Sequence, residues 1–149
     1  MCIRDRRLLF DQGRSVSVID GQNMRLGLNR DLGFTQGDRS ENLRRAAEVA
    51  KVMNAAGMIC IMSFVSPKEE IRARAAEVVG KDNFLVVHLK APRDVCDTRN
   101  DSQKKSDIEE ARAGFEDPAN PDLVLDTVND PANVCIAQVM SFLEEKKYI

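Results

Sequence analysis

An acid and a glycine, Asp20 and Gly21, directly follow the apolar run SVSVI at positions 15–19. An acid at the end of such a run can hold a magnesium-bound water or orient a hydroxyl group that accepts a phosphoryl group. The glycine would let the backbone approach a ligand closely. Asp-Gly also occurs in ordinary turns for purely local reasons, so the dipeptide alone leaves both a phosphoryl-transfer site and a plain turn open.

Two further places could bind an anion. Ser66 follows the apolar run MICIMSF and precedes Pro67, so it would lie near a helix N-terminus, where a hydroxyl and free backbone N–H groups can hold phosphate or sulfate. A serine there can equally be a plain N-cap. Arg39 and Asn42 are three residues apart at the start of a predicted helix, and together they could bind an anion above it. They could equally be solvated residues of an exposed helix face.

Other polar residues receive no functional assignment. His88 lies within the apolar run FLVVHL, which is typical of a histidine in the core or at a sheet edge. Arg44, Arg45 and Lys51 look like the solvated face of a helix, because no aromatic residues alternate with them as they would in a nucleic-acid patch.

The composition narrows the class of protein. The 149 residues suffice for one domain with its own core, and the formal net charge of −2 gives no overall attraction to nucleic acid or anionic membranes. The four cysteines form no C-x-x-C pair and three lie in apolar runs, which predicts reduced, buried thiols rather than disulfides or structural zinc. No apolar run approaches the roughly 18 residues that span a bilayer. We therefore expect a cytoplasmic protein without nucleic-acid or membrane partners.

The candidate residues need a scaffold of alternating strands and helices. Apolar runs rich in β-branched residues predict buried strands at 15–19, 58–64, 84–89 and 123–126. Helices are predicted from Asp38 as N-cap to Gly57 as C-cap, from Pro67 in a first turn to Val79, and from Ala132 to Lys147. Strands joined by helices predict a doubly wound α/β fold with a parallel sheet, in one domain over residues 1–149. The polar stretch 100–120 is predicted to lie on the surface.

Several blocks of the sequence together resemble one enzyme family. IDGQNMRLGLNRDLGFTQGDRSENLRRAAEVAKVMNAAG, FVSP, APRDVCDTR and PDLVLDT are similar, in order and spacing, to adenylylsulfate kinase over about residues 7–147. This family phosphorylates the 3′-hydroxyl of adenosine 5′-phosphosulfate with ATP and Mg²⁺ in sulfate assimilation. The resemblance implies the fold of the P-loop nucleoside-triphosphate kinases and a homodimer. It leaves open whether the domain stands alone or is fused to an ATP sulfurylase.

The family's site residues carry over onto this sequence one by one. Arg25, Arg39 and Asn42 would contact the phosphosulfate and the nucleotide, since guanidinium groups suit phosphate and sulfate oxygens. Phe34 would stack on the adenine. Asp20 would lie near magnesium and the attacking hydroxyl, and with Ser66 it is a catalytic candidate. The remaining substrate-binding positions are Gln22, Asn23, Val65 and Ser66, of which Ser66 matches the family's phosphoserine position in the ISP motif.

The sequence departs from the family most clearly in its ATP-binding elements. It contains no phosphate-binding loop of the type G-x-x-x-x-G-K-[ST], and RRLLFDQG resembles only the tail of the helix that follows this loop. We therefore expect the chain to be a fragment that lacks one strand–loop–helix unit of about 30 residues, and MCIRDR not to be native sequence. The strand of that unit is central, so its neighbours should expose unpaired edges. The 149-residue chain alone should show no ATP-dependent kinase activity.

Two smaller departures keep other functions open. Gln22 replaces the second acid of the family's DGDN pattern, and the lid between Arg99 and Pro121 retains only ARAG cleanly. Both favour a catalytically silent domain that binds adenylylsulfate as a regulator of an ATP sulfurylase. A P-loop kinase acting on another small hydroxyl substrate is a third interpretation.

Overall fold

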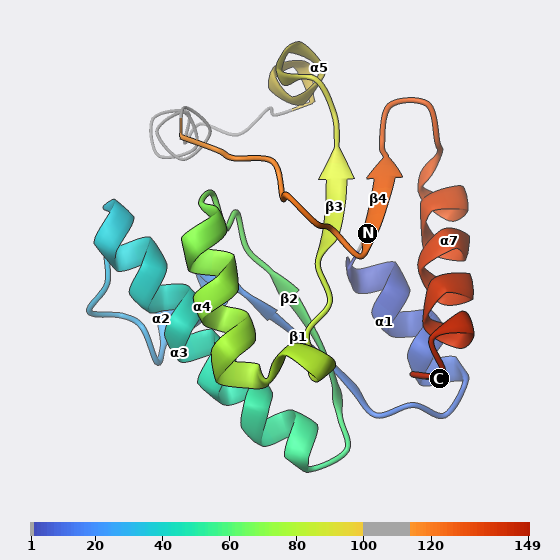
Figure 1. Ribbon diagram of the computed structural model, residues 1–149, viewed down its shortest axis with the longest axis horizontal. Coiled ribbons are helices and arrows are strands. Elements are labelled where there is room, and N and C mark those ends of the chain that lie inside the picture. The colour runs from blue at the N-terminus through green and yellow to red at the C-terminus, as the bar shows by residue number, and fades with distance from the viewer. Residues whose placement is uncertain (1, 100–113) are drawn as a thin grey trace.

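The computed structural model describes residues 2–99 and 114–149 (Figure 1). Residues 100–113, and with them most of the altered lid, lie outside the described part of the chain. Helices alternate with strands, as the sequence predicts. The elements are α1 (Cys2–Asp11), β1 (Val16–Asp20), α2 (Gly21–Leu26), α3 (Gln36–Ala55), β2 (Ile59–Ser63), α4 (Glu69–Val79), the 3₁₀ helix η1 (Lys81–Asn83), β3 (Val87–Lys90), α5 (Arg93–Thr98), β4 (Leu123–Asp126) and α7 (Ala132–Glu145).

All four predicted strands are present, and they form two parallel pairs. β1 pairs with β2 from Val16↔Ile59 to Asp20↔Ser63, and β3 pairs with β4 from Val87↔Leu123 to Lys90↔Asp126. Parallel strands joined by helices confirm the α/β class. In the described residues these pairs form two separate sheets, β1–β2 and β3–β4.

The separation leaves an apolar strand edge open. Leu89 of β3 is 47% exposed, although Leu125, its partner on β4, is completely buried. Within the described residues β3 pairs only with β4, so its other edge is unpaired.

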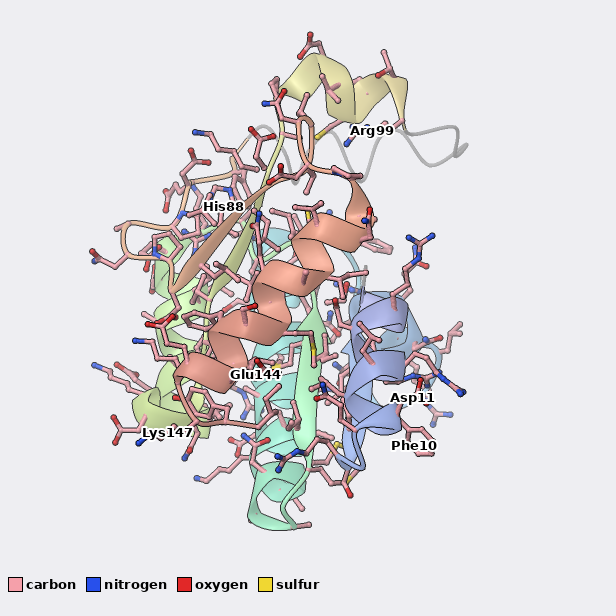
Figure 2. The ribbon with its side chains drawn as sticks, turned by 90° about the vertical axis from the view of Figure 1, so that its right-hand side faces the viewer. Phe10, Asp11, His88, Arg99, Glu144 and Lys147 are labelled. Atoms are coloured by element: carbon pink, nitrogen blue, oxygen red, sulfur yellow. The ribbon has the colours of Figure 1, made fainter. Side chains whose placement is uncertain are left out.

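The core is built around the first sheet. α1 and α7 lie side by side (Figure 2) and pack on β1 and β2 through Leu9, Ile136 and Met140. The apolar face of α3 is buried at Leu43, Ala46, Ala47 and Ala50, and small alanine side chains let α3 lie against α4. No helix of the described ranges has the length and apolar character needed to cross a membrane.

The boundaries of α3 differ from the prediction. The N-cap is Thr35, not Asp38: the Thr35 Oγ1 accepts the backbone N–H of Asp38 at 3.2 Å and donates to the Asp38 carboxylate at 2.8 Å. Asp38 occupies the N3 position of the capping-box pattern, but its carboxylate accepts the Thr35 hydroxyl and not the Thr35 backbone N–H. At the other end Ala56 is the cap, and Gly57 follows it with φ +79°.

The start of α4 also differs. The helix begins at Glu69 after Lys68, so Pro67 is not in its first turn and Ser66 is not its N-cap. Ser66 instead has φ +44°, a left-handed conformation that is uncommon for a residue with a side chain. Pro67 does not account for this, because a residue before proline favours extended conformations with negative φ. The last helix ends at Glu145, two residues before the predicted Lys147.

Candidate active site

Asp20 stands at the carboxyl end of β1 and begins α2. Its Oδ1 accepts the backbone N–H groups of Gln22 at 3.0 Å and Asn23 at 2.8 Å, and its Oδ2 accepts the Asn23 side-chain amide. Asp20 is thus an N-cap whose carboxylate direction is fixed by α2. Asn23 has a clear task in this geometry, since it orients the acid. Gln22 contributes its backbone amide.

Gly21 lies where three other side chains converge. A Cβ atom at this position would be 3.3 Å from the Phe64 ring, 3.4 Å from the Asn42 Nδ2 and 3.5 Å from an Arg25 nitrogen. The glycine therefore permits close packing of side chains from α2, α3 and the end of β2 around the tip of β1. This close approach, rather than an unusual turn, accounts for glycine here.

Arg25 is held by two backbone carbonyls. Its Nη1 donates to the carbonyl of Gly21 at 2.9 Å and its Nε to that of Gly33 at 3.0 Å. Its guanidinium lies over the Phe34 ring, 4.6 Å from the centroid. Burial lowers the pKa of Arg25, and the nearby positive charge of Arg39 lowers it further, whereas Asp38 acts in the opposite direction. Arginine still keeps its charge, so the surface around Phe34 is cationic.

The guanidinium groups of Arg25 and Arg39 both lie near the Phe34 ring. The ring is 40% exposed, and the Arg39 guanidinium lies 5.5 Å from its centroid. Arg39 also donates from Nε to the Phe34 carbonyl at 2.8 Å. Two cations around one accessible ring give a surface that can stack on a planar base and attract an anion at the same time.

Asn42 does not extend into solvent beside Arg39. It is only 2% exposed, and its Oδ1 accepts the Asn29 side-chain amide at 2.7 Å. This leaves the Asn42 Nδ2 beside Gly21. The alternative of a solvated Arg39–Asn42 pair is therefore wrong for Asn42. Sequence reasoning missed Asn29, whose only signal was a polar residue inside GLNRD.

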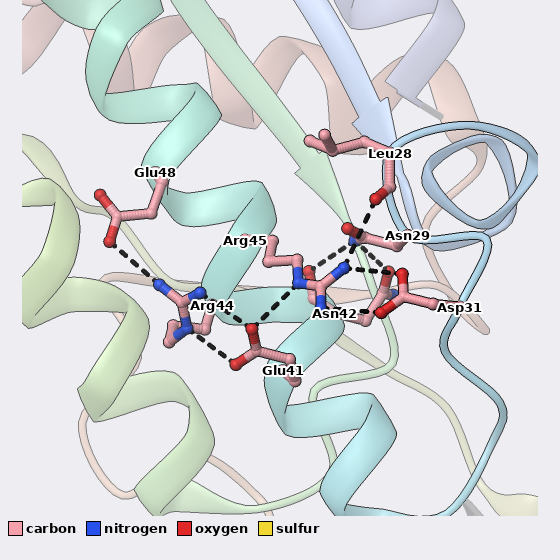
Figure 3. A network of polar contacts seen from close by, with 8 residues as sticks. All are labelled: Leu28, Asn29, Asp31, Glu41, Asn42, Arg44, Arg45 and Glu48. Atoms are coloured by element: carbon pink, nitrogen blue, oxygen red, sulfur yellow. Dashed lines mark hydrogen bonds and ion pairs between the residues drawn. The ribbon is translucent and has the colours of Figure 1, made fainter.

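An ion-pair network fixes the segment before Phe34 to α3 (Figure 3). Arg45 donates to both carboxylate oxygens of Asp31, at 2.8 and 2.9 Å, and to Glu41 at 3.0 Å. Arg44 bonds Glu41 through two nitrogens at 2.8 Å each, and Glu48 at 3.1 Å. Hydrogen bonds from Arg44 and then from Arg45 lower the pKa of Glu41 to about 2. Arg44 and Arg45 lie on a partly exposed helix face, and the sequence does not reveal that Asp31 folds back onto α3 to pair with Arg45.

Val65 and Ser66 follow the carboxyl end of β2, close to Asp20. The register sets Asp20 opposite Ser63, so the two residues continue from the strand end next to the acid. Val65 is exposed, and the Ser66 carbonyl accepts Arg72 Nη1 at 2.7 Å. Sequence reasoning did not identify Arg72, since an arginine four residues into a polar helix start carries no distinguishing pattern.

Among the residues gathered at the carboxyl end of β1, Asp20 is the carboxylate that we consider as a magnesium ligand. Within the described ranges no three His, Cys, Asp or Glu side chains gather closely enough to hold a metal. Asp20 suits Mg²⁺ only as one ligand, direct or through water, beside phosphate oxygens of a nucleotide. The described cysteines Cys60, Cys96 and Cys135 are free thiols, as predicted, although only Cys135 is fully buried. His88 is mostly buried at the edge strand β3.

Comparison with known proteins is decisive for the family. The family model for adenylylsulphate kinase matches residues 2–126. The chain belongs to the adenylylsulfate kinase family. This family consists of phosphotransferases with the P-loop fold, which confirms the predicted fold class.

Individual relatives agree with this assignment. A probable adenylyl-sulfate kinase of Bacillus subtilis is 40% identical over 151 aligned residues, which cover 94% of this chain and 75% of the relative. The bifunctional enzyme CysN/CysC of Rhodopirellula baltica is 42% identical over 96% of this chain, which spans 23% of that longer protein. Among solved structures, the APS kinase CysC of Mycobacterium tuberculosis in complex with AMPPNP and APS has a TM-score of 0.78 and 34% identity, covering 94% of this chain and 86% of that one.

Proposed function

We propose that this chain forms the adenylylsulfate-binding part of an adenylylsulfate kinase, which transfers a phosphoryl group from ATP to the 3′-hydroxyl of adenosine 5′-phosphosulfate. The observation that carries the proposal is the exposed Phe34 ring with the guanidinium groups of Arg25 and Arg39 near it, close to the acid at the tip of β1. A purine with a phosphosulfate group needs both a stacking surface and fixed positive charge. This group of residues offers both within one short stretch of chain.

Each residue has a specific task in this proposal. Phe34 stacks on the adenine, an interaction worth about 1–3 kcal/mol per base. Arg25 and Arg39 bind the phosphosulfate oxygens, and their backbone hydrogen bonds hold them in place before the substrate arrives. Asn42 donates a hydrogen bond to the substrate from Nδ2, because its side-chain oxygen already accepts the Asn29 amide.

Asp20 serves the transfer step. The 3′-oxygen forms a bond to the γ-phosphorus while the bond between that phosphorus and the departing ADP oxygen breaks, and the hydroxyl proton passes to the Asp20 carboxylate. Asn23 keeps the carboxylate aligned for this step. Asp20 would help to hold a magnesium ion, which would supply charge neutralisation for the phosphoryl oxygens. Val65 and Ser66 complete the substrate contacts, and Ser66 lies at the position that is a phosphoserine in the family.

A catalytically silent adenylylsulfate-binding domain is the second candidate. Gln22 favours it, because an amide replaces an acid that could orient the ribose or a cation-bound water. The bifunctional CysN/CysC relative supports a further proposal, that this domain can be part of a fusion with an ATP sulfurylase. We also propose a homodimer. Nucleotide binding without turnover in a chain that includes a phosphate-binding loop would favour the silent domain.

Isothermal titration of adenosine 5′-phosphosulfate into the 149-residue chain tests the binding site. Phe34→Leu should weaken binding about 5- to 150-fold through lost stacking. Phe10→Leu is the matched control, because Phe10 is also exposed but lies on α1, and it should bind like the wild type (Figure 2). Failure of the wild-type chain to bind, or equal binding by Phe34→Leu, would contradict the proposal.

A further inference from the structure

We infer that Arg72 is a positioning residue that sets the Val65–Ser66 backbone for substrate binding and links it to the segment 115–119. The inference rests on the proposed function, in which Val65 and Ser66 contact adenylylsulfate. The side chain of Arg72 is only 7% exposed. A buried guanidinium must have its N–H groups satisfied by hydrogen bonds, and those partners indicate what it holds in place.

Arg72 joins two segments that are far apart in the sequence. Its Nη1 donates to the Ser66 carbonyl at 2.7 Å, and its Nη2 donates to the Glu116 carbonyl at 2.8 Å. The Glu69 carboxylate accepts from both Nε and Nη2, which balances the charge. Only a planar, forked cation makes these bonds together. A lysine would keep the charge but has a single nitrogen.

The Ser66 conformation needs such support. A non-glycine residue with φ +44° costs on the order of 1–3 kcal/mol and persists only where its surroundings hold it. Arg72 holds the carbonyl of Ser66, and the Glu116 backbone N–H holds the next carbonyl, that of Pro67, at 2.7 Å. Two consecutive carbonyls are therefore fixed, and with them the direction of the Val65 and Ser66 side chains.

The segment 115–119 is bound to the same helix start by side chains. The Glu116 carboxylate accepts Lys68 Nζ at 2.9 Å and the Glu69 backbone N–H at 3.0 Å. Phe115 lies 5.8 Å from the Arg72 guanidinium. The chain then continues into β4, which belongs to the other sheet. Arg72 thus connects the loop after β2 with the half of the molecule that contains β3 and β4.

The test compares Arg72→Lys with Arg74→Lys, an exposed position on the same helix. Arg72→Lys retains the charge beside Glu69, so it should fold, yet its affinity for adenosine 5′-phosphosulfate should fall about tenfold or more because the Ser66 turn is no longer fixed. The amide resonances of Val65 and Ser66 should shift in its nitrogen-15 spectrum. Arg74→Lys should match the wild type in both measurements.

The outcomes separate this inference from the proposed function. If the wild type does not bind adenosine 5′-phosphosulfate, the proposed function fails. If the wild type binds and Arg72→Lys binds equally well, the positioning role alone is overturned. Should Arg72→Lys not fold, the Arg72 Nε–H signal of the wild type decides: protection from solvent exchange and a shift on ligand addition would support the role, whereas rapid exchange without a shift would overturn it.

Discussion

The carboxyl ends of β1 and β4 share one local geometry in two different surroundings. At β1 the Asp20 Oδ1 accepts the N–H groups two and three residues further on, and Asn23 returns its side-chain amide to Oδ2. At β4 the Asp126 Oδ1 accepts from Val128 at 2.9 Å and Asn129 at 3.1 Å, and Asn129 returns its amide at 2.8 Å. The pattern D-x-x-N thus closes a strand end by itself and marks no particular function.

The neighbours distinguish the two ends. Around Asp20, α2 and α3 each contribute an arginine, and the segment between them contributes the Phe34 ring. Around Asp126, Arg99 donates to the Thr127 carbonyl at 2.9 Å, and the adjoining hollow of about 490 Å³ is lined in part by Leu89 and Cys135. This difference supports the proposal that specificity for adenylylsulfate lies in the residues that follow Asp20, and not in the acid and its cap.

The largest expected effect on ligand affinity comes from replacing Arg25 at the β1 end, whereas replacing Arg99 at the β4 end should have little effect. Arg25→Ala should weaken binding of adenosine 5′-phosphosulfate about 10- to 150-fold, because charge-assisted hydrogen bonds to the anion are lost. Arg99→Ala should leave the affinity unchanged within about twofold, which is the size of effect that substitution of a surface residue usually has. Calorimetric titration measures both. Equal losses for the two variants would show that the ends are not functionally distinct.

The two capping asparagines give a smaller and sharper test. Asn23→Ala and Asn129→Ala each remove one side-chain hydrogen bond to an aspartate. Both should lower the melting temperature slightly and to a similar extent, because the geometry is the same. Only Asn23→Ala should weaken binding of adenosine 5′-phosphosulfate, about two- to tenfold. A loss of affinity in Asn129→Ala would remove the distinction.

The smallest effect concerns the network that supports Phe34. The pKa of Glu41 is lowered from 4.5 to about 2 in the folded chain, so its ion pairs add stability that is complete above pH 4.5 and lost as pH falls toward 2. Glu41→Gln should flatten the pH dependence of urea unfolding in that interval. Glu48→Gln, which removes only the outer partner of Arg44, is the control. A wild-type curve that is already flat there would contradict the assignment.

The sequence was most informative where function depends on contiguous residues. The strand ending at Asp20 could be read from its apolar run, and Arg25 and Phe34 were assigned through the resemblance of contiguous blocks to the family. The buried Asn29–Asn42 pair and the Arg72 bridge could not. They depend on how separate segments fold back onto helices, and polar residues carry no periodic signal for such contacts.

The same limit applies to the sheet and to the helix starts. Runs of apolar residues predicted four strands, but strand pairing is a long-range property, and the division into two sheets had to be seen in the structure. At α3 the prediction chose Asp38, although Thr35 makes the cap and Asp38 completes it. Either residue type is a good cap, so composition alone could not decide between them.

Chemical-shift mapping of the nitrogen-15-labelled chain during titration with adenosine 5′-phosphosulfate tests the central claim most directly. We expect the largest amide shifts at Gly21, Arg25, Phe34 and Arg39, and little change from 126 to 129. The largest shifts at 126–129, or none at the β1 end under saturating ligand, would contradict the claim that the adenylylsulfate site lies at the carboxyl end of β1.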